Sequence, residues 1–227
     1  MTEMMISPEA YYEFQLKGKD AAGIKTAIRS LKRDISRLKN VMEHPDYRPT
    51  IMPTEDTRIW CDRLYLERAK EALREMGEEY TPTKAEIKAL QFDENIPEIS
   101  SISLEIGGYF SGYQIYKLTV AENAIQRSVE GMLHHPIDEQ TDQSNFGDSE
   151  NLSLEDFREA IADLHIGEWR KRYDTERFGF DVLDGTQWEM KIEYNGARKT
   201  LEFFGSNAYP YNFEQVKDLF VVDSSFF

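Results

Sequence analysis

Cysteine is almost missing from this chain, which has 227 residues and one cysteine, Cys61. A single cysteine excludes a disulfide framework and a thiolate metal cluster. No apolar stretch approaches the roughly 20 residues that a bilayer-spanning helix needs. The N-terminal stretch MTEMMISPEAYYEF is acidic and has no basic run followed by an apolar run, so it predicts no secretory signal. These absences predict a soluble cytoplasmic protein, from a bacterium or a phage.

Basic residues are scarce in the second part of the chain. Residues 1–91 hold 16 Lys and Arg against 16 Asp and Glu, whereas residues 92–227 hold 11 against 26, so the whole net charge of −15 lies there. Such a region repels the phosphate backbone of a nucleic acid. The acidic region has two interpretations. It is a face that docks on a basic protein, or a face that only aids solubility. The candidate partner-binding residues are Asp138, Glu139, Asp142, Asp148 and Glu150.

The first part, residues 1–91, is predicted to be a helical hairpin region. Apolar residues between residues 20 and 42 recur at alternating spacings of four and three, and a second such stripe runs over residues 57–76. Two amphipathic helices joined by a short loop fold back antiparallel. A third, short helix is predicted to begin near Thr83.

The first predicted helix also carries a basic stripe. Such a stripe can contact nucleic acid or a partner protein. It can also be a solvated face that lies beside the glutamates of the second helix, and the sequence favours this second interpretation. Its members are Lys25, Arg29, Lys32, Arg33, Arg37 and Lys39.

The second part, residues 92–227, is predicted to be an acidic α+β domain. Its clearest signal is an alternation of apolar and polar residues around Trp188, bounded by Asp184-Gly185 and Asn195-Gly196, which are preferred dipeptides of two-residue hairpin turns. This pattern predicts a three-stranded meander over residues 178–203, with Trp188 on the buried face. Two further strands are predicted over residues 101–106 and 116–120. The fold class is therefore α+β, a mostly antiparallel sheet of about five strands with helices packed on one face.

Motifs for catalysis, metals and phosphate are missing. The stretch GGYFSG contains no lysine and joins strand to strand, so it is no phosphate-binding loop. Neither frame of the acidic stretch after His135 fits an EF-hand, and the His134-His135 pair does not predict a metal site. There is no G-x-S-x-G or H-E-x-x-H motif. We therefore predict a non-enzymatic protein with no catalytic residue, metal or cofactor.

The densest set of functional side chains follows the helix that begins after Ser153. As an alternative site, this set would bind an anion or a peptide. The competing interpretation, which we favour, is that Trp169 and Tyr173 are anchors of the hydrophobic core. The set comprises His165, Glu168, Trp169, Arg170, Arg172, Tyr173 and Arg177.

The last helix is predicted over residues 213–220. Asn212 as its N-cap and Gln215 three positions later form a capping box. Helix capping does not account for the polar residues in the loop that precedes this helix. That loop is therefore a minor candidate for a binding site. Its residues are Ser206, Asn207 and Tyr209.

Two stretches carry a family resemblance. The run LHIGEWRKRYDTERFGFDVLDGTQWEMKIEYNGARKTLEFFGSNAYPYNF, together with GKDAAGIKTAIRSLKRDISRLKNVMEHP, resembles a group of uncharacterised proteins of gut Gram-positive bacteria and their mobile elements. The resemblance covers much of the chain. It implies a bacterial or mobile-element setting and carries over no activity and no functional residue.

Charge and setting together predict an interaction protein. The expected function is acidic inhibition of a bacterial nucleic-acid-handling or defence protein, by mimicry of nucleic acid as in anti-CRISPR proteins. The expected partner is a protein such as a nuclease or a nucleoprotein complex, with no membrane and no nucleic acid bound by the acidic domain. The alternatives are an accessory or regulatory mobile-element protein whose basic helix face contacts DNA, and an enzyme whose site is assembled from distant residues.

Overall fold

The computed structural model describes residues 5–50, 52–108, 112–122, 124–132, 152–179 and 185–222. The chain forms two compact units, Met1–Thr83 and Lys84–Phe227. The sequence places the boundary after residue 91, whereas in the structure the third helix is part of the second unit.

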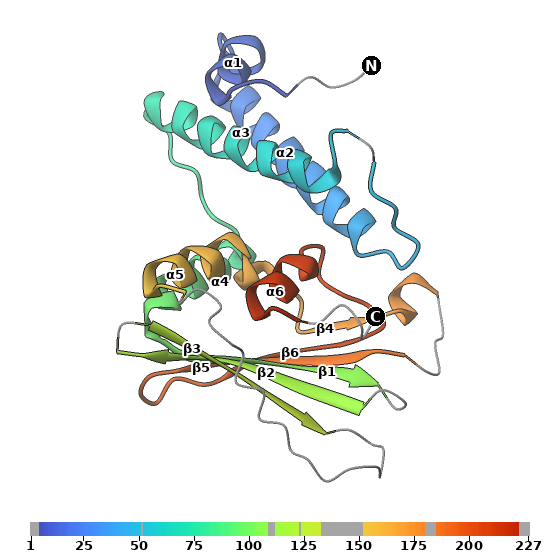
Figure 1. The fold of residues 1–227 in the computed structure, drawn as a ribbon. Coiled ribbons are helices and arrows are strands. Elements are labelled where there is room, and N and C mark those ends of the chain that lie inside the picture. Colours follow the sequence, from blue (N-terminus) through green and yellow to red (C-terminus); the bar gives the residue numbers. More distant parts are fainter. Residues whose placement is uncertain are drawn as a thin grey trace. The chain divides into compact units, whose positions relative to one another are not determined.

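The first unit is built on a helical hairpin, as predicted (Figure 1). The buried residues of α2 all belong to the expected apolar stripe and are Ile24, Ile28, Leu31, Ile35 and Leu38. Asp20 caps the helix by accepting a hydrogen bond from the Gly23 amide at 2.8 Å. A short helical turn before α2, which the sequence did not reveal, stacks Tyr11 on Tyr65 with 4.4 Å between the ring centroids. The helices of this unit are α1 (Pro8–Tyr11), the π-helical η1 (Tyr12–Leu16), α2 (Ala21–Met42) and α3 (Glu55–Glu75).

A buried carboxylate holds the loop between α2 and α3. The Glu55 side chain accepts hydrogen bonds from the Tyr47 hydroxyl at 2.8 Å and from the Thr50 amide at 3.2 Å, and the residue is 5% exposed. Burial by itself raises the pKa of Glu55, but these hydrogen bonds outweigh it and leave the pKa below its ordinary value of 4.5. Glu55 therefore ties the loop to the start of α3.

The second unit is a six-stranded sheet covered by helices. The strand order is β3-β2-β1-β5-β6-β4, antiparallel except for the parallel pair β4–β6. Its helices α4, α5 and α6 lie on the same side of the sheet (Figure 1). The strands are β1 (Ile99–Gly108), β2 (Gly112–Ala121), β3 (Ala124–Met132), β4 (Arg172–Asp174), β5 (Gln187–Tyr194) and β6 (Leu201–Ser206). The helices are α4 (Lys84–Asn95), α5 (Leu154–Asp163), α6 (Phe213–Phe220) and the short η2 (Ile96–Glu98), η3 (Ile166–Glu168) and η4 (Glu176–Phe178).

The predicted meander is only partly correct. The β5–β6 hairpin is present with Trp188 on its buried face, but Phe178 lies in η4 and not in a strand. β1 is the other neighbour of β5, paired so that Ile106 faces Trp188. The link between β5 and β6 spans residues 195–200, so it is longer than the two-residue turn expected at Asn195-Gly196. Asp184 lies outside the described residues.

Trp188 is the centre of the core between sheet and helices. It is 3% exposed, its ring centroid lies 4.8 Å from that of Phe213 and 6.5 Å from that of Trp169, and its indole Nε1 donates to the Ala208 carbonyl at 2.9 Å. Gly205 is its cross-strand partner, where an added Cβ would lie 2.1 Å from that Nε1. Glycine at residue 205 is therefore what lets the indole lie against β6.

Gly205→Ala should destabilise the protein by about 1–3 kcal/mol, because the new methyl group must displace the indole or the strand. Gly131→Ala on β3 is the matched control, since its Cβ would have no neighbour nearer than the Gln114 Cγ at 3.9 Å. Urea unfolding followed by tryptophan fluorescence measures both. Equal stability of the two variants would show that the indole does not need this glycine.

Glu55→Gln should lower the free energy of unfolding by about 1–3 kcal/mol at pH 7, because charge-assisted hydrogen bonds are lost. The carboxylate's contribution is present above its ordinary pKa of 4.5 and is lost as the pH falls through the lower folded value. The difference from the native protein should therefore shrink in acid. Urea unfolding at pH 7 and pH 3 tests this, with the exposed Glu79→Gln as control. A difference that stays constant with pH would contradict the assignment.

Candidate functional site

The sheet face opposite the helices is polar and carries most of its charge as carboxylates. Side chains alternate along each strand, so the burial of Trp188, Met190 and Ile192 turns their neighbours to this open face. None of the described helices of the second unit lies on that side (Figure 1). The acidic residues at open-face positions are Glu105, Glu130, Asp174, Glu189, Glu193 and Glu202, and the basic residues are Lys117, Arg172 and Lys191.

One row of cross-strand neighbours on this face crosses all six strands. In the order of the strands from β3 to β4, the row reads Glu130, Ile115, Glu105, Glu189, Phe204 and Arg172. The exposed Phe204 therefore lies between a carboxylate on β5 and a guanidinium on β4. This arrangement places apolar and charged groups side by side on an accessible surface.

Glu105 and Glu189 face each other directly across β1 and β5. Like charges in directly opposite positions destabilise a sheet. Lys191 Nζ lies 2.8 Å from Glu189 Oε1, and this hydrogen bond raises the pKa of Lys191. Among the described residues, Glu105 has no ion pair within 4 Å. Lys191 therefore offsets the charge of Glu189 directly and that of Glu105 at longer range, and the two carboxylates with this one lysine keep a net negative charge.

A cleft of about 350 Å³ opens over this carboxylate pair. Tyr113 and Gln187, joined by a 3.3 Å hydrogen bond, form one side of it, and Arg172 lies at the sheet edge 3.5 Å from Asp174. Aromatic faces and carboxylates in one cleft can hold a cationic side chain, by cation–π contact and by charge-assisted hydrogen bonds. The lining residues are Glu105, Tyr113, Arg172, Tyr173, Gln187, Trp188, Glu189, Phe204, Gly205 and Ser206.

The alternative site predicted after residue 164 is divided between core and surface. Trp169 and Tyr173 are buried core anchors, as the favoured interpretation held, with the Trp169 ring edge-on to Phe203 at 5.5 Å. His165, in the left-handed conformation, precedes η3 and Glu168 is its last residue, while Arg170 and Arg177 are exposed. Only Arg172 and Tyr173 of this set line the open-face cleft. The structure therefore does not bring the seven residues together as one site.

The capping-box prediction for Asn212 is wrong. Asn212 makes no capping hydrogen bond to α6. Its buried side chain instead accepts from the Trp169 indole at 3.2 Å and donates to the Leu164 carbonyl at 2.7 Å. A buried indole N–H needs an acceptor, and Asn212 provides it, so it links α6 to the end of α5.

The loop before Asn212 also has mainly a structural role. Tyr209 stacks on Trp188 with 6.4 Å between centroids, and Asn207 takes a positive φ of 51° while its amide donates to the Thr186 carbonyl. Asparagine is among the few residues that tolerate this conformation. Ser206 is the one predicted loop residue that lines the open-face cleft.

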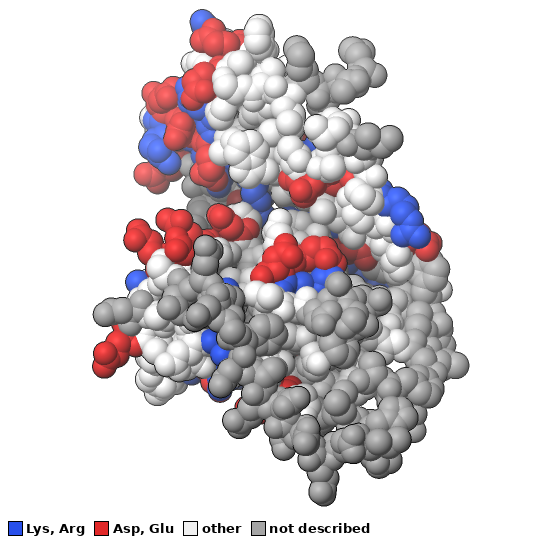
Figure 2. All heavy atoms as spheres, in the orientation of Figure 1, with Lys and Arg blue, Asp and Glu red and all other residues white. Residues whose placement is uncertain are grey.

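The predicted acidic face, Asp138, Glu139, Asp142, Asp148 and Glu150, lies outside the described residues. The described acids also gather on the helical layer (Figure 2), where α5 carries Glu155, Asp156, Glu159 and Asp163. Sequence reasoning missed Glu105 and Glu189, although it placed both in strands. The sequence shows that both side chains alternate with buried residues and so point outward. It does not show that they face each other, because that depends on the pairing of β1 with β5.

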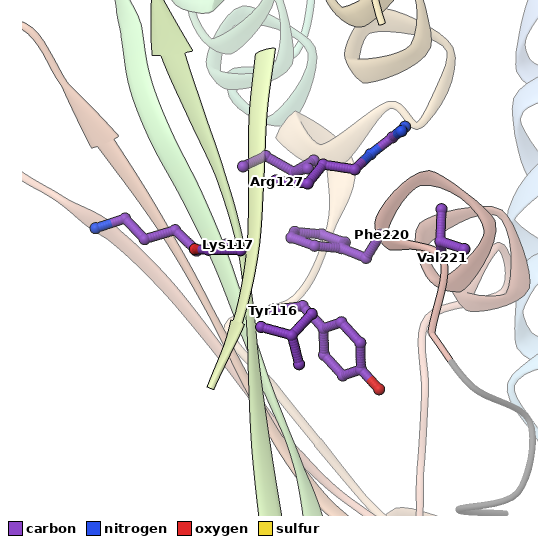
Figure 3. Close-up of a pocket in the computed structure, with 8 residues that line it drawn as sticks. Tyr116, Lys117, Arg127, Phe220 and Val221 are labelled. Carbon is purple, nitrogen blue, oxygen red and sulfur yellow. The ribbon is translucent and has the colours of Figure 1, made fainter. Parts of the chain in front are cut away.

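A small cavity lies between β2, β3 and the end of α6 (Figure 3). Its volume is about 10 Å³, which is at the lower limit for one water molecule. Arg127 is one of its lining residues, and the Nε of this side chain is buried without a hydrogen-bond partner among the described residues. Phe220 and Val221 of α6 and its cap close the other side (Figure 3). The cavity is too small for an organic ligand.

Comparisons with protein-family models, curated proteins and solved structures find no match for this chain. None of the described helices has both the length and the apolar character that crossing a membrane requires. Within the same residues, no group of three or more His, Cys, Asp or Glu side chains is arranged to hold a metal ion.

Glu105→Gln should raise the free energy of unfolding by about 0.2–1 kcal/mol, because it removes one of two opposed charges. The gain should shrink at high salt, where the repulsion is screened. Glu193→Gln is the control of opposite sign, since Glu193 accepts from Ser101 Oγ at 2.5 Å and lies 3.9 Å from Lys117. Urea unfolding at low and high salt measures both. A loss of stability in Glu105→Gln would mean that the carboxylate serves the fold.

Proposed function

We propose that this is an interaction protein that captures a basic segment of another protein on the open face of its sheet. The supporting observation is the opposed pair Glu105 and Glu189 under an open cleft. A cation that enters the cleft screens the repulsion between the two carboxylates, and this relief adds to the free energy of binding. Phe204 and Tyr113 offer aromatic surface to the stem of the same side chain.

The partner class follows from charge. Proteins that handle nucleic acid present lysine and arginine where phosphates bind, and an acidic surface can occupy those groups. Inhibition of such a protein, in a bacterial or mobile-element setting, fits the charge of the second part of the chain and the family resemblance. The acids at residues 138–150 would extend the attraction at longer range.

The first experiment titrates the whole protein into a fluorescent 15-residue peptide that contains four arginines, with a peptide that contains four citrullines as the neutral counterpart. The native protein should bind the arginine peptide more tightly. Glu105→Gln with Glu189→Gln should weaken binding by about tenfold or more, because both carboxylates that face the cation are lost. Fluorescence anisotropy at several salt concentrations gives the affinities.

The matched control is Glu155→Gln with Glu159→Gln, which makes the same change of net charge on the exposed surface of α5. It should weaken binding far less. Equal losses in the two double variants would reduce the interaction to non-specific attraction by an acidic protein. Equal binding of the arginine and citrulline peptides would end the proposal.

A further inference from the structure

The first unit has a cleft of opposite charge. It is wide and open to solvent, with a volume of about 770 Å³, and runs along the last three turns of α2 and the loop that follows. Three arginines line it, Arg33 and Arg37 from the helix and Arg48 from the loop, together with His44. Asp46 is the one acidic residue among the described residues that line it.

The arginines are held near one another by the fold. Arg33 and Arg37 are four residues apart on one exposed side of α2, where like charges repel. Arg48 is carried by the loop that Glu55 fixes through Tyr47 and Thr50, and its own Nη1 donates to the Tyr47 carbonyl at 3.2 Å. The buried carboxylate thus places a third guanidinium beside two that already repel each other.

Among the described residues, the charges of Arg33 and Arg37 are only weakly neutralised by their neighbours. Arg37 Nε lies 3.8 Å from Asp34 Oδ1, with both side chains about half exposed, and Arg33 bonds to the neutral Ser30 hydroxyl at 3.2 Å. The negative end of the helix dipole does not account for Arg33, because that effect is confined to the last turn and α2 continues to Met42. By contrast, Lys25 and Lys32 of the same predicted basic stripe are paired with Glu78 and Tyr80 at 2.8 Å.

We propose that this arginine cleft binds phosphate groups, and that its occupant is the sugar–phosphate backbone of a nucleic acid. Guanidinium groups bind phosphate oxygens with two parallel hydrogen bonds. The exposed Arg29 continues the row of Arg33 and Arg37 one turn further, so the row is about 12 Å long, more than one phosphate group needs. The site is independent of the open-face cleft, and it makes the protein an adaptor with one protein-binding and one nucleic-acid-binding surface.

The test measures anisotropy of a fluorescein-labelled 20-nucleotide single strand, and of its duplex, with the whole protein over a range of salt concentrations. The triple variant Arg33→Gln, Arg37→Gln and Arg48→Gln should weaken binding by about tenfold or more. It should reduce the slope of log K against log salt by about 3 for the duplex and about 2 for the single strand. The lysine versions of the three changes should retain part of the affinity, because the charge is kept.

The control removes three exposed charges of the same unit, with Lys17→Gln, Lys19→Gln and Arg74→Gln, and it should change binding little. Glu105→Gln with Glu189→Gln should leave it unchanged, which separates this site from the proposed function. The proposal is overturned if no oligonucleotide binds, or if the control loses as much affinity as the arginine variant. Binding of pyrophosphate without any oligonucleotide binding would assign the cleft to a small phosphorylated ligand and overturn the nucleic-acid assignment.

Discussion

The burial of Trp188 is the constraint on which the second unit depends. Its indole is enclosed by aromatic rings from three other segments, it donates to the Ala208 carbonyl, and Gly205 leaves it room. Side chains alternate with a period of two, so a strand that buries Trp188 must turn Glu189 outward. The same register places Glu105 opposite Glu189. The packing of the core therefore determines which charges meet on the open face.

Repulsion between like charges is the feature common to both candidate surfaces. Glu105 and Glu189 oppose each other on the sheet, and Arg33 and Arg37 lie one helical turn apart beside a loop that adds Arg48. Like-charge neighbours of this kind generally lower stability by a few tenths of a kcal/mol, which is the cost we expect for each arrangement. Neither repulsion is needed for packing, since the core of each unit is formed by other side chains. Binding of a ligand of opposite charge would relieve the repulsion in each arrangement.

The sequence predicted the parts of the fold that follow from short-range periodicity. The stripe of α2, the alternation around Trp188 and the strands β1 and β2 were all legible, because each depends on residues close in the chain. The pairing of β5 with β1 could not be predicted, because strands that are far apart in the sequence leave no local signal of their pairing. The same limit hid the Glu105–Glu189 pair. Asn212 was assigned to capping because its buried partner, Trp169, lies 43 residues away.

Carboxylate footprinting of the captured complex tests the central claim most directly. Carbodiimide-driven labelling with glycine ethyl ester, read by mass spectrometry, would report the reactivity of each acidic side chain in the free protein and with its bound basic partner. Glu105 and Glu189 should be protected on binding, while Glu155 and Glu159 on α5 should be labelled as before. Unchanged labelling of Glu105 and Glu189 in a complex that protects the acids of α5 would contradict the central claim.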